Sequence, residues 1–333
     1  MHKPDNRMER RKWWLDRFSK KCQIKKARNN TASQVDREKY KAPKIMDFDD
    51  NIAETLIFLN KLRCFDIKKE KRFYLNLKSL TNITPPAIIA LITELDVLRI
   101  RNNKMKLKLR DYNSWDSMIR VQFRDIGLFK LLNIFESPNR MVKPHDDGDI
   151  KYFVTIKSKG FDKDNRVKLL NNIHDFISKN IPNRHELELV ISEAAANVAN
   201  HAYHENDKLC NWWLTASYNK LNNMLTVMIM DHGVGIPVML KKKFRKYLEH
   251  LGLLDSSDAE KIKSATELGI SQTQEEYRGK GLFYIKEYAK KCDRNSVAIY
   301  SDKGGYIYDG KNEQLVHLEH SLNGTLIVWN IEV

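Results

Sequence analysis

Three short stretches in the second half of this 333-residue chain place acids, a side-chain amide and glycines at short, regular spacings. Residues 193–197 place a carboxylate and a side-chain amide four positions apart. Residues 231–237 place an acid and two glycines directly after an apolar run, and residues 279–282 hold two glycines ahead of an amphipathic segment. Glycines in such positions permit positive φ and close approach of the backbone to a ligand. Their order and local contexts constrain the fold more than any other feature of the sequence.

Residues 183–202 are expected to form the helix that carries the first stretch. Apolar side chains recur at helical spacing from Leu187 to Val198. Asn183 with Glu186, directly after a proline, has the pattern of a capping box, which places the start of the helix.

Glu193, Asn197 and His201 are spaced by four residues, so they project from one stripe of this helix. An amide oxygen can ligate Mg²⁺, and a carboxylate one turn away can polarise an attacking hydroxyl. A solvated polar helix face has the same pattern, so this stretch alone does not decide between the two interpretations.

The glycine stretches have contexts that suit a nucleotide. Residues 223–230 read as a buried strand that ends at Asp231, which can accept a hydrogen bond from an exocyclic amine such as that of adenine. The alternative is an ordinary Asp/Gly turn. Residues 278–289 begin as a glycine loop and continue as a helix, whose first amides can cradle phosphate, while Arg278 and Lys280 add charge. The sequence has neither the P-loop signature nor the Rossmann glycine fingerprint.

Over roughly residues 150–333 the chain resembles the GHKL superfamily of ATPases and kinases, which has the Bergerat ATP-binding fold. Residues 192–203 are most similar to its anti-sigma-factor serine kinase branch. The resemblance implies an α/β (α+β) fold class, with a two-layer α/β sandwich in this region. The matching positions are Glu193, Asn197 and His201 in the helix motif, Asp231, Gly233 and Gly235 in the DxGxG box, Gly279, Gly281 and Leu282 in the GxGL box, and Gly324 with Thr325 in the terminal glycine-threonine element.

The same resemblance implies roles for these residues and names ATP and Mg²⁺ as cofactors. Glu193 would be the general base, Asn197 the Mg²⁺ ligand and Asp231 the adenine anchor. Residues 238–278 would form a lid that closes over ATP and opens after hydrolysis. The other implied cofactor-binding residues are His201, Gly233, Gly235, Ile236, Arg278, Gly279, Lys280, Gly281, Leu282 and Thr325.

Residues 46–136 are expected to form a separate α/β domain, followed by a linker at 137–150. The pattern predicts strands at 72–77 and 104–109 and helices at 85–100 and 117–132, the second interrupted at Gly127. This order resembles the STAS-type domain of anti-sigma-factor antagonists. Prolines stand where that family carries its phosphoacceptor serine, with Thr84 as the nearby hydroxyl. The resemblance therefore implies a degenerate STAS-like module used for binding or dimerisation.

Residues 1–45 form a basic arm, with fifteen Lys/Arg against five Asp/Glu in a chain of net charge +15. With Trp13 and Trp14 inside it, the arm can contact nucleic acid, an anionic membrane surface or a protein, or remain a solvated tail. No apolar run is long enough to span a membrane, there is no secretory signal, and the four cysteines are scattered. We expect a cytoplasmic protein with reduced thiols and no zinc site.

The leading hypothesis is an ATP-binding protein that hydrolyses Mg-ATP and uses lid closure as a switch that controls a protein partner. One alternative is a serine/threonine kinase that phosphorylates a separate STAS-like protein. A second alternative is a nucleic-acid-binding adaptor whose ATP site is structural. Homodimerisation is compatible with all three hypotheses.

Overall fold

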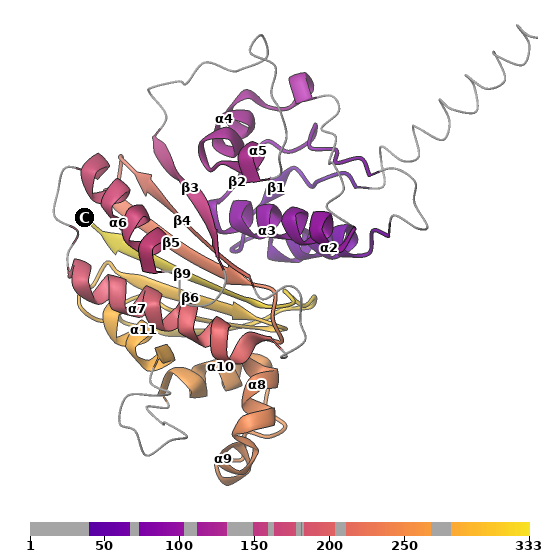
Figure 1. Cartoon of the computed structure of the whole chain (residues 1–333). Helices are drawn as coiled ribbons and strands as arrows, with labels where there is room; N and C mark the ends of the chain where they lie inside the picture. The colour runs from indigo at the N-terminus through magenta and orange to yellow at the C-terminus, as the bar shows by residue number, and fades with distance from the viewer. Residues whose placement is uncertain are drawn as a thin grey trace, which may run out of the picture.

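The computed structural model describes residues 40–66, 73–102, 112–131, 149–158, 163–177, 181, 183–203, 211–267 and 281–333, except for the side chains of Asn200 and His201. Its centre is a seven-stranded antiparallel sheet in the order β3-β4-β5-β9-β6-β7-β8 (Figure 1). The mixed α/β fold class is therefore confirmed. The strands are β3 Ile150–Ser158, β4 Trp212–Asn219, β5 Met224–Asp231, β6 Ser296–Ser301, β7 Gly304–Tyr308, β8 Glu313–His317 and β9 Thr325–Glu332.

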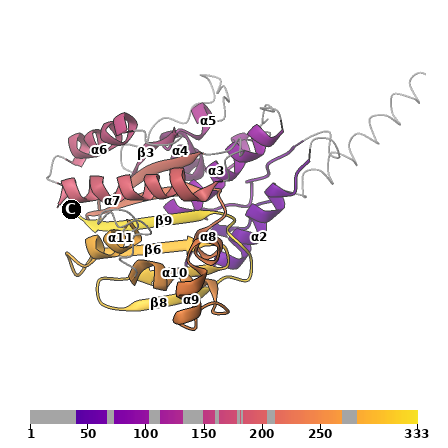
Figure 2. The same ribbon diagram turned by 60° about the horizontal axis from the view of Figure 1, so that its bottom comes forward.

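Helices from the second half of the chain cover one face of the sheet (Figures 1 and 2). They are α6 Lys163–Ile177, α7 Arg184–Asn197, α10 Asp258–Glu267 and α11 Gly281–Ala289. A π-helical turn, η3 Val198–Ala202, continues α7. Two short helices, α8 Ile236–Lys243 and α9 Arg245–His250, extend away from the sheet beyond α10 (Figure 1).

Helices from the first half of the chain cover the opposite face. Helix α3 Pro85–Arg101 lies against β4, β5 and β9 and packs on α2 Ile52–Arg63, while α4 Ser117–Asp125 contacts β3. The other elements of this part are β1 Ile45–Met46 and β2 Asn82–Ile83, which pair in parallel, η1 Tyr112–Ser114 and α5 Leu128–Leu131. The described residues thus form three layers, and the sheet with the helices of the second half of the chain makes up two of them, as a two-layer sandwich of residues 151–333 would.

The central strands are apolar on both faces because each face has its own hydrophobic core. In β5, Val227 and Ile229 belong to the core under α7, whereas Met228 and Met230 belong to the core under α3. This explains why β5 reads as a continuous apolar run rather than an alternating one. The described part of residues 46–136 therefore shares a core with the sheet and does not enclose a separate one.

Several local predictions for the first half of the chain can be compared with the structure. The helix predicted at 85–100 is α3, and the helix predicted at 117–132 is interrupted at Gly127, whose φ is +85°. The strand predicted at 72–77 is wrong over its described residues, which form only an isolated bridge at Asn76. The strand predicted at 104–109 and most of the linker at 137–150 lie outside the described residues.

The predicted capping box and the predicted end of the basic arm are wrong, although α7 begins directly after Asn183 as expected. Asn183 has a left-handed φ of 51° and caps α7 without a side-chain hydrogen bond, so the capping box does not form. Instead, the Asn183 carbonyl accepts the Glu186 N–H at 2.9 Å. The basic arm does not extend to residue 45, because Tyr40 and Ala42 are buried in the core beside α2 and α3. Residues 1–39 lie outside the described part of the chain.

Across the described residues, the structure contains no helix that combines the length and the apolar character needed to cross a membrane.

Candidate functional site

A row of polar side chains crosses three adjacent strands at one end of the sheet. Asp231 of β5 pairs with Thr325 of β9, which pairs with Ser301 of β6. Paired residues lie on the same face, and alternation from Ile229 places this row on the side of α7. All three side chains are buried, and the Ser301 and Thr325 hydroxyls are 3.1 Å apart.

Ser301 joins this row to two neighbouring loops. Its Oγ donates to the Gly324 carbonyl at 2.9 Å and accepts the Ile236 N–H, also at 2.9 Å. Sequence reasoning missed Ser301. Its signal is weak: a small polar residue at the end of an otherwise apolar strand, opposite a residue already assigned to the site.

Asp231 is a buried carboxyl with acceptor capacity to spare. Burial raises the pKa of Asp231 to about 7, and the hydrogen bond from the Gly233 N–H to Oδ1, at 2.7 Å, opposes this rise. Among the described residues no cation contacts this carboxylate. A buried acceptor of this kind favours a ligand that donates hydrogen bonds, such as a purine amine.

Glycines bring the neighbouring loops into backbone contact with this row. A Cβ on Gly233 would lie 2.2 Å from the Ala202 carbonyl oxygen, and one on Gly324 would lie 2.1 Å from the Asp231 carbonyl oxygen. Gly324 and Gly235 also have positive φ, +131° and +82°. A side chain at Gly233 would separate the DxGxG loop from the end of η3. A side chain at Gly324 would separate the same loop from the terminal glycine-threonine element.

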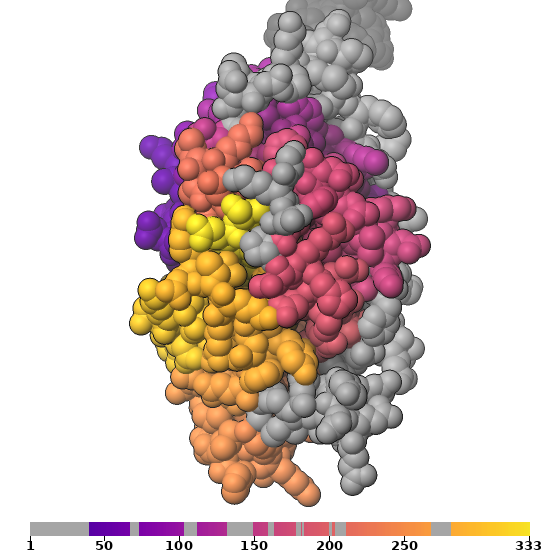
Figure 3. Space-filling model, turned by 90° about the vertical axis from the view of Figure 1, so that its left-hand side faces the viewer, coloured from indigo at the N-terminus to yellow at the C-terminus, as the bar shows by residue number. Residues whose placement is uncertain are grey.

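The first and third sequence stretches also meet. Helices α7 and α11 pack side by side, as the pink and gold surfaces in Figure 3 show. A Cβ on Gly281, at the start of α11, would lie 2.8 Å from Asn197 Nδ2 and 3.2 Å from Glu193 Oε2. Glu193 is half-buried, and burial raises the pKa of its carboxyl. Only a residue without a side chain leaves these two polar groups undisturbed.

The predicted site residues therefore fall into two connected groups. Glu193, Asn197 and Gly281 form one group, and η3, which follows Asn197 directly, joins it to the second at Gly233. The second group consists of Asp231, Gly233, Gly235, Ile236 and Thr325. Leu282 packs against the core under α7. The His201 side chain and residues 278–280 lie outside the described part of the chain, so Arg278, Gly279 and Lys280 remain predictions.

The expected lid, residues 238–278, includes a helix that is part of the core. Helix α10 packs on α11, β7 and β8, and its Ile262 and Ala265 are buried with the α7 layer. Helix α10 is thus built into the α7-side core, and the lid expected over residues 238–278 stays a prediction. Helices α8 and α9 precede α10, and residues 268–280 lie outside the described residues.

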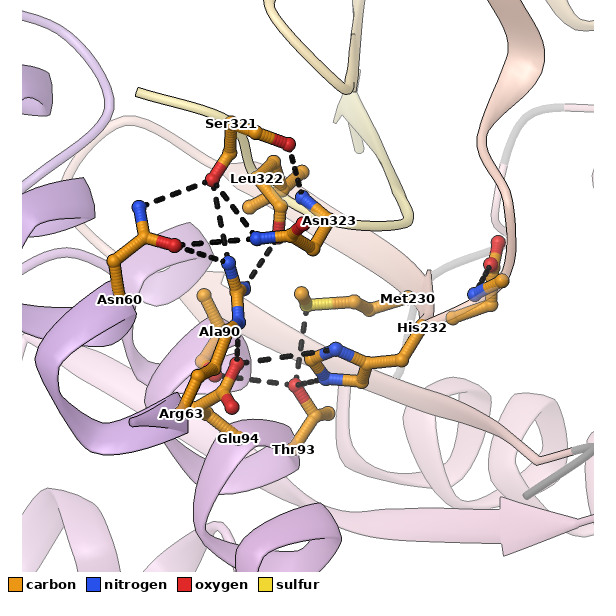
Figure 4. A network of polar contacts seen from close by, with 12 residues as sticks. Asn60, Arg63, Ala90, Thr93, Glu94, Met230, His232, Ser321, Leu322 and Asn323 are labelled. Atoms are coloured by element: carbon orange, nitrogen blue, oxygen red, sulfur yellow. Dashed lines mark hydrogen bonds and ion pairs between the residues drawn. The ribbon is translucent and has the colours of Figure 1, made fainter. Parts of the chain in front are cut away.

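His232, between Asp231 and Gly233, points to the opposite face. Its ring packs edge-on against Trp213 with centroids 5.5 Å apart, and its Nε2 lies 3.1 Å from Thr93 Oγ1 in α3 (Figure 4). Sequence reasoning missed this residue as well. The period of two along a strand provides the signal, because the residue after Asp231 must face away from it.

The donor set at Glu193 and Asn197 fits one kind of metal. Within the described ranges, no three His, Cys, Asp or Glu side chains are grouped to hold an ion. An amide oxygen with one carboxylate nearby suits Mg²⁺, which keeps several waters and takes further ligands from phosphates. The protein residues present are compatible with a metal that arrives with its nucleotide.

Comparison of the sequence with known proteins provides no family assignment. No protein-family model matches the chain, and the search of curated proteins gives no match.

Proposed function

We propose that the chain binds Mg-ATP between α7 and the DxGxG loop and hydrolyses it in a GHKL-type reaction. The observation that supports this proposal best is the set of close glycine contacts. Gly281 lies against Asn197 and Glu193, Gly233 against Ala202, and Gly324 against Asp231, although these stretches are far apart in sequence. If these glycines had no common role, we would not expect them to lie together around one carboxylate, one amide and one buried acid.

In this proposal the base binds at the strand ends and the phosphates lie toward α11. Asp231 accepts a hydrogen bond from the adenine amine, and Thr325, its partner on β9, lies beside the ring. The Asn197 amide oxygen ligates Mg²⁺, which supplies neutralising charge at the phosphates. Glu193 takes a proton from the attacking water, a role favoured by a half-buried carboxylate whose pKa is raised.

The conformational switch of this proposal starts at the DxGxG loop. Helix α8 begins one residue after Gly235, and the Ile236 N–H is held by Ser301 in the polar row. A change in this loop on nucleotide binding would therefore move α8 and α9, which extend from the body of the protein (Figure 1). These helices carry Lys241, Lys242, Lys243, Arg245 and Lys246 and are the proposed contact with a partner.

The test is to replace Glu193 by Gln and to measure ATP binding and phosphate release separately. We expect turnover to fall by about 10²- to 10⁴-fold, the usual contribution of a general base. The dissociation constant for ATP should stay within about threefold, because the base acts only in the transition state. Glu188→Gln, the same change on another face of α7, is the matched control and should alter neither quantity.

Two results would redirect the proposal. Equal losses of binding and turnover in Glu193→Gln would remove Glu193 as the base. Transfer of the labelled γ-phosphate to a protein, in place of release as free phosphate, would favour the serine/threonine kinase alternative. A protein partner and contact of the basic arm with nucleic acid remain predictions, and binding assays with residues 1–39 deleted would test the latter.

A further inference from the structure

A polar network on the α3 side of the sheet connects helices α2 and α3 to two loops (Figure 4). One loop follows Asp231 at the end of β5, and the other precedes Thr325 at the start of β9. The centre of the network is Arg63, the last residue of α2. The Arg63 Nε donates to Glu94 Oε2 of α3 at 2.5 Å, and Nη1 donates to the Ser321 carbonyl at 3.2 Å. Arg63 Nη2 donates to the Leu322 carbonyl. One guanidinium thus joins two helices to the loop that leads into Gly324 and Thr325.

Asn60, one turn earlier on α2, contacts the same loop. Its Nδ2 donates to the Ser321 carbonyl at 3.2 Å, and its Oδ1 accepts from Arg63 at 2.8 Å and from Asn323 Nδ2 at 3.2 Å. Asn323, directly before Gly324, has a left-handed φ of 53°. The side chains of α2 therefore hold this loop through its backbone and through the residue that precedes the glycine.

The second loop is held from α3 through His232. Thr93 Oγ1 lies 3.1 Å from His232 Nε2 and 3.2 Å from the Met230 sulfur, and Glu94 Oε2 lies 3.8 Å from His232 Nδ1. Burial and the nearby Arg63 and Arg101 hold the pKa of His232 well below its usual range, against a hydrogen bond with the Asn323 backbone. The ring is therefore neutral near pH 7. Its contact with Thr93 connects α3 to the backbone between Asp231 and Gly233.

This arrangement is not required to hold the layers together. Arg63 and Glu94 are 11% and 1% exposed, and burying such a pair costs desolvation that an apolar pair would avoid. The apolar core around Leu91, Leu95 and Met228 already joins α3 to the sheet. What the polar network adds is a fixed geometry for two loops, one directly after Asp231 and the other directly before Thr325.

We propose that the α2–α3 network, formed by Asn60, Arg63, Thr93, Glu94 and His232, fixes the two loops that hold Asp231 and Thr325 against the adenine base. This inference rests on the proposed function. It makes Arg63 and Thr93 positioning residues, which set the affinity for the base from the opposite face of the sheet. The phosphate end of the site, at Glu193, Asn197 and Gly281, lies on the α7 side and has none of these contacts.

The experiment compares Thr93→Val with Thr93→Ser in the full-length chain. Valine keeps the shape of the side chain but removes the hydroxyl that reaches His232, whereas serine restores it. The control is Thr215→Val, the same change in β4, which removes a buried hydroxyl that donates to the Phe153 carbonyl at 2.6 Å and lies in neither loop. Dissociation constants for ATP and ADP and the turnover at saturating ATP are measured for each variant.

We expect Thr93→Val to raise the dissociation constants for ATP and ADP by the same factor, about 5- to 20-fold, a usual range for coupling between sites. Turnover at saturation should stay within about twofold, because Glu193 and Asn197 are untouched. Thr93→Ser should keep most of the affinity, and Thr215→Val should leave both quantities unchanged.

Each other outcome has a definite meaning. If Thr93→Val lowers turnover but not affinity, it has only reduced the folded fraction, and the positioning role is refuted. The positioning role is also refuted if Thr215→Val weakens ATP and ADP binding as much as Thr93→Val does, or if Thr93→Val leaves the affinity unchanged. If the wild-type protein binds neither ATP nor ADP, the proposed function fails first and the inference falls with it.

Discussion

Replacing Gly281 by Ala should change stability and activity in opposite directions. Gly281 begins α11 without a positive φ, so Ala is sterically allowed by the backbone and restricts the unfolded chain. Such a change typically stabilises a protein by about 0.4–1 kcal/mol. The new Cβ would lie 2.8 Å from Asn197 Nδ2, which is the free end of a side chain and can move away. The backbone therefore has no need to shift.

The movement of Asn197 sets the size of the functional effect. Ordinary van der Waals contact begins at 3.4 Å, so the amide must retreat by about 0.6 Å, and Glu193 Oε2 at 3.2 Å must give slightly. A misplacement of about 1 Å in a catalytic group can cost about 100-fold. We therefore expect Mg-ATP turnover to fall about tenfold or more, while the melting temperature stays equal or rises by up to about 3 °C.

The assay combines thermal unfolding with steady-state phosphate release at several Mg²⁺ concentrations. Asn197→Ala alone and in combination with Gly281→Ala completes a double-mutant cycle. If the glycine acts by sparing Asn197, Gly281→Ala should add little to the loss already caused by Asn197→Ala. Turnover within about twofold of wild type in Gly281→Ala would refute this reasoning. A melting temperature lowered by several degrees would show instead that the helix itself had moved.

Two further predictions concern buried charges. The raised pKa of Asp231, about 7, means that the folded protein binds more protons than the unfolded chain from about pH 4 to pH 7, so this residue lowers stability as the pH rises through that window. Asp231→Asn should remove this pH dependence of the free energy of unfolding, which is at most about 1.4 kcal/mol per pH unit and is measured by urea titrations at pH 5 and pH 7.5. The same variant should weaken ATP binding at least about tenfold. Equal changes of stability with pH in wild type and variant would contradict the raised pKa of Asp231. Arg63→Met should lower the free energy of unfolding by about 3–5 kcal/mol, because it leaves Glu94 buried and unpaired. Adding Glu94→Leu should recover most of that stability without restoring ATP affinity, and recovery of both would show that the pair has no positioning role.

Much of the candidate site could be predicted from the sequence because its signals are local. A carboxylate and an amide at helical spacing, and glycines after an apolar run, depend only on the elements that carry them. The structure places Gly281 against Asn197 and Gly324 against Asp231. The capping box failed because Asn183 adopts a left-handed conformation, and the pattern of residue types does not reveal that choice.

The rest of the fold depends on long-range contacts. The apolar run of β5 does indicate burial on both faces, but not which segment covers the second face. Helix α3 was predicted with nearly its observed bounds and assigned to a separate domain, because periodicity does not show what a helix packs against. His232 and Arg63 were missed for the same reason, since the contacts that join them to another layer, Thr93 for His232 and the Leu322 carbonyl for Arg63, are more than 130 residues away in the chain.

The shared core on the α3 side has a practical consequence for protein production. A fragment that starts at β3 would leave Met228, Met230 and Val328 without the helices that cover them. Such a wide apolar surface promotes aggregation. Expression trials should therefore retain residues 40–131. A chimera that exchanges this part for another sequence must supply an equally apolar helix layer to cover this face of the sheet.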